Sequence, residues 1–256
     1  MEIRGVDVSR WQGDIDWKRV KAAGVGFAMI KAAQGTRPDP RFDKNFKDAL
    51  KSGVYAGAYV YSLAVTPGEA KAEAEAVLEQ TRGRELRYPI ALDLEDERLE
   101  KLKKRELGEV IKAFCGAVRA GGRIPMIYSN LDWFKNRIPK SAVKGEYVWL
   151  ACWRDSLPDE DFGCAMWQKG SGSVDGIEGE ADIDVSFIDF AALTAPEASY
   201  ALAVPRRRGD EYAAMQRALN AGNYRDADGK ALTVDGIWGK RSFEAFQKLV
   251  SKAGEG

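Results

Sequence analysis

The chain has 256 residues, of which 45% are hydrophobic and 30% charged, so it can form a sizeable core and is not disordered as a whole. Lys plus Arg and Asp plus Glu both number 39, and this balance gives no support to a nucleic-acid partner. The chain contains no histidine, which excludes Ser-His-Asp and Cys-His nucleophiles, histidine zinc sites and histidine proton shuttles. Acid–base chemistry near neutral pH must therefore come from carboxylates, Lys, Tyr or Cys.

Short apolar segments alternate with helical patterns from the start of the chain to residue 193. We expect strands over residues 5–9, 27–33, 55–62, 89–95, 125–130, 147–153, 164–170 and 182–186. We expect helices over residues 17–23, 41–52, 67–81 and 104–120, with little helical pattern between the last three strands. Strands separated by helices predict parallel βαβ units, and eight strands suggest closure. The predicted fold class is therefore α/β, an irregular (β/α) barrel whose late helices are missing.

A break follows this region. Residues 194–209 carry two prolines and lack clear periodicity, which predicts a linker. Beyond it, residues 211–221 and 242–250 have apolar side chains at helical spacing, and the sequence VDGIWG between them supplies turn glycines. We therefore expect a barrel domain over residues 1–193, a linker, and a small all-α domain over residues 210–256.

Two features bear on compartment and cofactors. Three cysteines without CxxC spacing, Cys115, Cys152 and Cys164, predict buried free thiols, and we expect neither a cofactor nor a thiolate metal site. The opening MEIRGVDVSRWQG lacks an apolar stretch suited to a signal peptide, and no window approaches about 18 apolar residues. We therefore expect a protein that is made in the cytoplasm and does not span a membrane.

Acidic residues are concentrated at predicted strand ends. In YPIALDLEDE, Asp93 and Glu95 share one face of the strand, while Leu92 and Leu94 share the other. That face looks into the barrel at the carboxyl end of the strand, where barrel active sites lie. Two further strand ends carry acids, Asp7 in GVDVS and Asp182 with Asp184 in ADIDV. Such crowding raises at least one carboxyl pKa, which is the pattern needed to protonate a glycosidic oxygen. The alternatives are solvated strand ends paired with Lys or Arg, or a site for Mg²⁺ or Ca²⁺.

Aromatic residues fall near the same strand ends. They are Trp11, Tyr59, Tyr61, Tyr128, Trp149 and Trp153. Aromatic faces can stack on sugar rings, although core packing is the better interpretation of any single one. Seven tryptophans in the chain favour a carbohydrate ligand for the set. Gln34 and Gln168 add polar groups at a similar depth.

Seven segments in order, GVDVSRWQGDIDW, GFAMIKAAQG, GAYVYS, PIALDLE, PMIYSN, VWLACW and GIEGEADIDVS, resemble glycoside hydrolase family 25, the lysozymes of bacterial peptidoglycan. The resemblance implies a flattened barrel that cuts the β-1,4 bond between N-acetylmuramic acid and N-acetylglucosamine. It implies that Glu95 is the general acid/base. Asp93 would orient or stabilise the substrate's 2-acetamido group as an internal nucleophile with net retention, while a nucleophilic role for Asp93 itself stays open.

The same resemblance suggests the rest of the site. Asp7 and Asp182 would be supporting carboxylates. Substrate contacts would come from Lys31, Tyr61, Tyr128 and Trp149, to which we add Gln168 for its polar group. One departure is Val60, which stands where many relatives carry histidine, and we expect it to bear on substrate geometry.

The C-terminal segment is similar to the small helical peptidoglycan-binding module. The positions that match its motif are Gln216, Leu219, Asn220, Asp235, Gly236, Gly239, Phe246 and Gln247. Considered by themselves, the apolar residues are core and the glycines form turns. A wall-binding module would raise the effective concentration of a hydrolase on an insoluble wall.

These observations predict a monomeric muramidase whose partner is peptidoglycan. Three alternatives stay open: a catalytically inactive wall-binding protein on the same barrel, a chitin-type glycosidase, and a metal-dependent barrel enzyme. Free thiols and the absence of a visible leader suit a phage-type endolysin released through a separate membrane pore. A bacterial autolysin or secreted toxin whose leader has been removed is the alternative.

Overall fold

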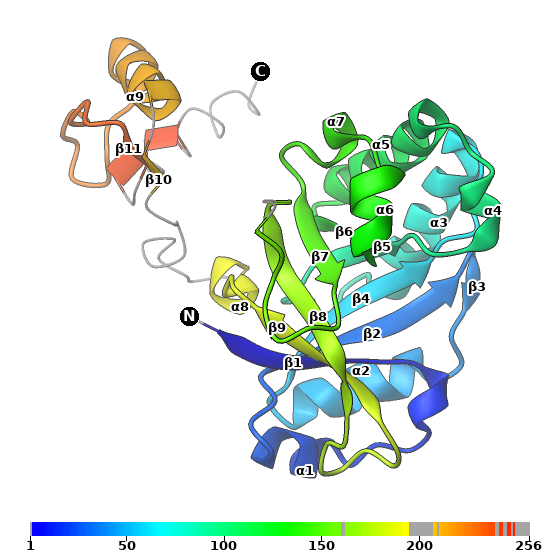
Figure 1. Cartoon of the computed structure of the whole chain (residues 1–256). Helices are drawn as coiled ribbons and strands as arrows, with labels where there is room; N and C mark the ends of the chain where they lie inside the picture. Colours follow the sequence, from blue (N-terminus) through cyan, green and yellow to red (C-terminus); the bar gives the residue numbers. More distant parts are fainter. Residues whose placement is uncertain are drawn as a thin grey trace. The chain divides into compact units, whose positions relative to one another are not determined.

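The computed structural model describes residues 2–159, 162–194, 207–208, 210–238, 241–242, 245–246 and 248. The chain forms two compact units, Met1–Asp189 and Phe190–Gly256 (Figure 1). Of the expected linker over residues 194–209, only Thr194, Arg207 and Arg208 are among the described residues. Within the described ranges, no helix has both the length and the apolar character needed to cross a bilayer.

Eight strands of the first unit close into a barrel, as the sequence predicts. They are β1 (Ile3–Val8), β2 (Phe27–Gln34), β4 (Tyr55–Tyr61), β5 (Ile90–Asp93), β6 (Pro125–Asn130), β7 (Tyr147–Ala151), β8 (Cys164–Gly172) and β9 (Ala181–Ser186). Their order around the barrel is β1-β9-β8-β7-β6-β5-β4-β2, and pairing of β1 with β2 closes the ring. Neighbours are parallel except β9, which is antiparallel to both β8 and β1. The short connection between β8 and β9 explains this reversal, because a parallel crossover needs a dozen or more residues. A short strand, β3 (Arg37–Pro38), pairs antiparallel with β2.

The four predicted helices are present as α1 (Trp17–Ala22), α2 (Phe42–Lys51), α3 (Pro67–Gln80) and α5 (Lys104–Ala120). Local signals start them: α3 begins at a capping box between Thr66 and Glu69, with Pro67 in its first turn. The structure adds helices that the sequence pattern did not predict: η1 (Arg10–Gln12), α4 (Glu97–Glu100), α6 (Leu131–Asn136), α7 (Lys140–Val143) and α8 (Phe190–Leu193). Four of the five have only three or four residues, which is too short for a helical period to be recognised, and α6 has six.

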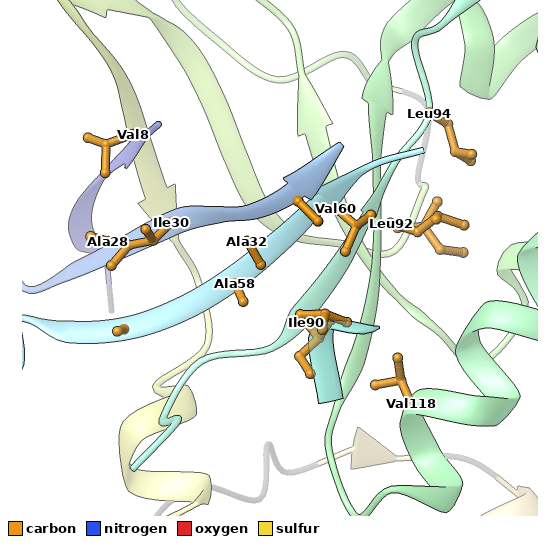
Figure 2. Close-up of a cluster of buried hydrophobic side chains, with 14 of the residues drawn as sticks. Val8, Ala28, Ile30, Ala32, Ala58, Val60, Ile90, Leu92, Leu94 and Val118 are labelled. Carbon is orange, nitrogen blue, oxygen red and sulfur yellow. The ribbon is translucent and has the colours of Figure 1, made fainter. Parts of the chain in front are cut away.

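The main core lies between the strands and the surrounding helices. Side chains on the outer face of the barrel meet there, including Ile30, Val60 and Leu92 from strands and Leu94 just after β5, with Val118 from α5 among them (Figure 2). Leu92 and Leu94 are completely buried, and burial of such a side chain contributes about 1.5–3 kcal/mol. Because side chains alternate along a strand, burying these leucines outside directs Asp93 to the inside.

The interior of the barrel is filled by side chains near the amino end of β2. The Phe27 ring stacks on Tyr88 with centroids 4.3 Å apart and an interplanar angle of 8°. Strand β1 approaches this ring so closely that a Cβ atom added at Gly5 would lie 2.2 Å from the Phe27 ring. Met29, Met126 and Met166 are completely buried as well.

The second unit contains α9 (Asp210–Ala221) and an antiparallel pair, β10 (Arg207–Arg208) with β11 (Ile237–Trp238), which adds strands to the expected helices. Its described core is Leu219, Leu232 and Ala245, with Tyr224 and Phe246 packed against them. The expected helix over residues 242–250, like Gly239 and Gln247, lies largely outside the described residues.

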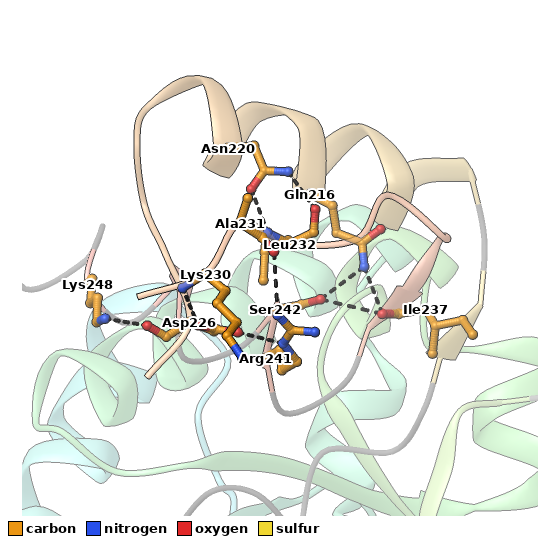
Figure 3. Close-up of polar contacts among 10 residues, drawn as sticks. All are labelled: Gln216, Asn220, Asp226, Lys230, Ala231, Leu232, Ile237, Arg241, Ser242 and Lys248. Atoms are coloured by element: carbon orange, nitrogen blue, oxygen red, sulfur yellow. Dashed lines mark hydrogen bonds and ion pairs between the residues drawn. The ribbon is translucent and has the colours of Figure 1, made fainter. Parts of the chain in front are cut away.

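Polar residues of the C-terminal motif hold this unit together (Figure 3). Gln216 Nε2 lies 3.0 Å from both Asp235 Oδ1 and Ser242 Oγ, and Gln216 Oε1 accepts from the Gly236 N–H. Asn220 bonds both backbone groups of Leu232 at 2.8 Å. These motif residues therefore form hydrogen bonds to backbone and side-chain groups within the unit.

Candidate active site

A pocket of about 220 Å³ lies at the carboxyl end of the parallel strands. It is lined by Asp7, Tyr59, Asp93, Glu95, Tyr128, Trp149, Trp153, Gln168 and Asp182. The four carboxylates to which the sequence assigned a role, Asp7, Asp93, Glu95 and Asp182, meet here. Asp182 reaches this end because β9 runs antiparallel to β1, which pairs Asp182 with Asp7.

The backbone around Asp93 and Glu95 is held from two neighbouring strands. The Ser62 N–H donates to the carbonyl oxygen of Asp93, and the Leu94 N–H donates to the carbonyl oxygen of Tyr128, both at 3.0 Å. The Ser129 hydroxyl donates to the carbonyl oxygen of Leu94 at 2.6 Å. With Leu94 anchored outside the barrel, the residues on either side of it project into the pocket. Asp93 is only 4% exposed, whereas Glu95 is exposed at the mouth.

The buried carboxyl group of Asp93 lacks a full set of partners. Its Oδ1 is buried without a hydrogen-bond partner among the described residues. Desolvation raises the pKa of Asp93 well above its usual range, the charge of Glu95 raises it further, and Lys31 opposes the shift. The pocket thus contains a buried carboxyl oxygen that a substrate N–H could satisfy.

Glu95 has the electrostatics of a proton donor. Partial desolvation raises its pKa, Lys31 opposes the shift, and the acidic neighbours Asp182 and Asp96 add to it. The pKa of Asp182 is raised too, first by desolvation and then by Glu180. A carboxyl group that keeps its proton towards neutral pH can act as a general acid.

Gln168 organises the opposite wall of the pocket. Its Nε2 donates to Asp7 Oδ2 at 2.9 Å, while its Oε1 accepts from the Tyr128 hydroxyl at 3.1 Å and from Trp153 Nε1 at 3.0 Å. Burial raises the pKa of Asp7 to about 7, Asp182 adds to the rise, and the bond from Gln168 opposes it. Gln168 therefore connects an acidic residue to two aromatic side chains of the site.

Two of the expected substrate contacts do not line the pocket. Lys31 Nζ lies 4.6 Å from the centre of the Tyr61 ring and 5.9 Å from that of Tyr59. Desolvation lowers the pKa of Lys31, and Asp93, Asp39 and Glu95 oppose the shift. Desolvation raises the pKa of Tyr61 to about 12. Lys31 therefore influences the pocket through its charge and not as part of its wall.

Other residues are placed differently from the sequence expectations. Tyr59 and Trp153 line the pocket; the sequence placed both in the strand-end aromatic set but did not single them out as substrate contacts. Val60 is completely buried on the outer face beside Leu92 (Figure 2), so the expectation that it bears on substrate geometry is wrong. The physical reason is that side chains alternate along a strand, so Val60 points to the opposite face from Tyr59 and Tyr61.

A second pocket of about 400 Å³ adjoins the first. It shares Tyr128, Trp153 and Gln168 with it and adds Asn130, Asp132 and Arg154 among its lining residues. Trp153 is 61% exposed, so its indole face is open to a ligand that spans both pockets. The shared residues therefore join the two pockets into one longer surface.

Cysteines and metal ligands complete the description. Cys115, Cys152 and Cys164 are free thiols, as predicted, but only the first two are buried, because Cys164 is partly exposed at the start of β8. Over the residues that the structure describes, no three Cys, Asp or Glu side chains form a group that could hold a metal ion.

An eight-stranded α/β barrel with several raised-pKa carboxyls at its strand ends is the arrangement expected of a glycoside hydrolase. The family model for glycosyl hydrolases family 25 matches residues 6–177. The uncharacterized protein YegX of Escherichia coli K12 is 33% identical over 194 residues, which cover 72% of this chain and 69% of YegX. Lysozyme M1 of Streptomyces globisporus is 31% identical over 195 residues, which cover 70% of this chain and 66% of that protein.

The fold comparison agrees with the sequence comparison. The crystal structure of the bacterial lysozyme from Streptomyces coelicolor matches with a TM-score of 0.62 and 27% identity, covering 72% of this chain and 92% of that one. The chain belongs to glycosyl hydrolase family 25, and it is a glycoside hydrolase.

Proposed function

We propose that this protein hydrolyses the β-1,4 bond between N-acetylmuramic acid and N-acetylglucosamine in bacterial peptidoglycan. Membership of the family and the lysozyme names of its relatives support this substrate. The observation that carries the chemistry is the convergence of Asp93 and Glu95 in one pocket, where the pKa values of both are raised.

In the first step, the protonated Glu95 donates its proton to the glycosidic oxygen while the bond from that oxygen to C1 of the sugar breaks. The carbonyl oxygen of the 2-acetamido group forms a bond to C1 and closes a five-membered ring. Asp93 accepts a hydrogen bond from the acetamido N–H, which positions that group and stabilises the positive charge that develops on it. The unpartnered Asp93 Oδ1 is the atom suited to this bond.

In the second step, the ionised Glu95 takes a proton from water, and the water oxygen attacks C1. The ring opens, the acetamido group is regenerated, and the anomeric configuration is retained overall. Asp7 and Asp182 support the reaction as neighbouring carboxylates, and the aromatic rings of Tyr128 and Trp153 provide faces for the sugar. In the competing pathway Asp93 itself forms the bond to C1.

The test is mass spectrometry of borohydride-reduced fragments released from purified peptidoglycan by wild type, Glu95→Gln and a control, Glu97→Gln on the exposed start of α4. We expect new reducing ends on muramic acid from wild type and the control. Glu95→Gln should fold but lose about 10²–10⁴-fold in rate, because an amide cannot donate the required proton.

Other outcomes would favour the alternatives. Reducing ends on glucosamine would show that the other glycosidic bond is cut. Preferential release of fragments from chitin would show that the substrate is a chitin-type polymer. A folded wild-type protein that releases no fragments would indicate an inactive wall-binding protein. Activity that disappears with EDTA and returns with Mg²⁺ would indicate a metal-dependent enzyme.

We also propose that the segment over residues 210–256 binds peptidoglycan and anchors the barrel to the bacterial cell wall, and that the protein acts as a monomer. The resemblance of its motif supports the binding role. Because Gln216 and Asn220 are engaged within the unit, wall contacts would come from its exposed residues, such as Met215 and Val234. Production inside a host followed by release onto the wall, as for a phage-type endolysin, is the cellular setting we propose.

A further inference from the structure

One ionisable side chain beneath the pocket has no part in the proposed reaction. Asp184 on β9 is completely buried, two residues after Asp182 on the same face of the strand. Its Oδ1 accepts a hydrogen bond from Trp149 Nε1 at 2.8 Å. Its Oδ2 is buried as well, and no N–H group of the described residues donates to it.

The neighbour of Asp184 that explains this geometry is Asp7. Each of these two carboxyl groups acts on the pKa of the other, and Oδ2 of Asp184 is the buried oxygen that lacks a donor. Two ionised carboxylates can only accept hydrogen bonds, so a direct hydrogen bond between Asp7 and Asp184 requires that one of the two acids carries a proton. The same proton would satisfy the otherwise unpartnered Oδ2 of Asp184.

The surroundings decide which acid holds the proton. Asp7 Oδ2 already accepts from Gln168 Nε2, and Asp7 borders the pocket, whereas Asp184 is shut off from solvent. The groups that act on Asp184 are Asp7 from β1, Tyr128 from β6, Trp149 from β7 and Asp182 from its own strand, and Gln168 of β8 is its register partner. None of these is a cation, so an ionised Asp184 would be a buried charge without compensation.

We propose that Asp184 is a positioning residue that remains protonated and donates its proton from Oδ2 to Asp7 while its Oδ1 accepts from Trp149. Asp7 is then held between two donors, Gln168 and Asp184, and the pair carries at most one negative charge. The catalytic consequence rests on the proposed function, in which Asp7 supports the reacting sugar.

The charge environment agrees with this assignment. Burial raises the pKa of Asp184 well above its usual range, Asp7 raises it further, and the bond from Trp149 opposes the shift. The hydrogen bond from Asp184 lowers the pKa of Asp7. Loss of the donor would therefore disturb both the position and the ionisation of Asp7.

The first test measures stability and does not depend on the substrate. A carboxyl group that binds its proton more tightly in the folded state makes stability fall as pH rises, from its unfolded pKa of about 3.9 up to its folded pKa. Asp184→Asn removes this titration. Relative to that variant, the unfolding equilibrium constant of wild type should rise about tenfold per pH unit between about pH 5 and pH 7.

Urea unfolding followed by tryptophan fluorescence supplies this readout, because six of the seven tryptophans lie between residues 11 and 167 of the first unit. Asp155→Asn, which removes an exposed carboxyl, controls for the change in net charge. If the ratio of the unfolding equilibrium constants of wild type and Asp184→Asn does not change with pH, the proposal is overturned, because Asp184 would then be ionised in the folded protein.

The second test compares Asp184→Asn with Asp184→Val on peptidoglycan. The amide can donate to Asp7 and accept from Trp149, so kcat should stay within about twofold of wild type. Valine leaves both partners unpaired, and we expect kcat to fall at least about tenfold with KM within about twofold. A folded Asp184→Asn that loses about 100-fold in kcat would contradict a neutral Asp184. If wild type itself is inactive, the proposed function fails, while the stability comparison still decides the protonation of Asp184.

Discussion

Ser129 on β6 donates its hydroxyl to the carbonyl oxygen of Leu94 at 2.6 Å, and both residues are completely buried. Leu94 lies between Asp93, the last residue of β5, and Glu95 in the turn that follows. A hydroxyl on the neighbouring strand therefore helps to set where Asp93 and Glu95 point.

Replacing Ser129 by alanine should weaken catalysis through this backbone contact. The Leu94 carbonyl would be left buried without its partner, which costs about 1–3 kcal/mol of stability. We expect kcat to fall about tenfold with little change in KM, measured on soluble peptidoglycan fragments. Ser171→Ala removes an exposed hydroxyl that bonds Glu180 and is the matched control. Wild-type kcat in Ser129→Ala would show that the turn holds its position without this bond.

Lys31 should tune the pH dependence of activity. Its positive charge lowers the pKa values of both Asp93 and Glu95, so Lys31→Met should raise them. Glu95 would then keep its proton to higher pH, and the alkaline limb of the profile of kcat/KM against pH should move upward. Lys44→Met, which removes an exposed lysine of α2 paired with Asp48, should leave the profile in place. A shift to lower pH would contradict the charge coupling.

Alanine substitutions at two glycines should change the stability of the barrel in opposite directions. A Cβ at Gly5 would lie 2.2 Å from the Phe27 ring, so Gly5→Ala should destabilise the barrel by about 1–3 kcal/mol through overpacking. Gly116 is exposed on α5 with no atom within 4 Å of an added Cβ, so Gly116→Ala should stabilise it by about 0.5–1 kcal/mol. Urea unfolding measures both changes, and equal effects at the two sites would refute the close packing around Gly5.

Deleting residues 194–256 separates cleavage from wall binding. Hydrolysis of soluble fragments should be retained, because the pocket is built entirely from the first unit. Sedimentation of the protein with purified cell walls should weaken, since the effective concentration that a tethered module supplies would be lost. Equal loss in both assays would mean that this segment supports the fold of the barrel.

Much of the fold could be predicted from local patterns. The α/β class, the eight barrel strands and the helices α1, α2, α3 and α5 follow from alternation, helical spacing and capping signals in the sequence. The short helices α4 and α7 could not be predicted, because four residues contain too little periodicity. Short helices form where the chain must turn between elements, as at Asn130, whose side chain caps α6.

The candidate site likewise combines features that the local sequence predicts with features that depend on the tertiary structure. The sequence alone determined that Asp93 and Glu95 share a face, because alternation along one strand is a local property of the backbone. Only the tertiary structure decided that Asp7 and Asp182 pair across β1 and β9, that Lys31 stays outside the pocket wall, and that Asp184 lies against Asp7 beneath it. Those relationships depend on strand order, on register and on closure of the barrel. They join residues up to 177 positions apart in the chain, as Asp7 and Asp184 are, and no local pattern specifies such contacts.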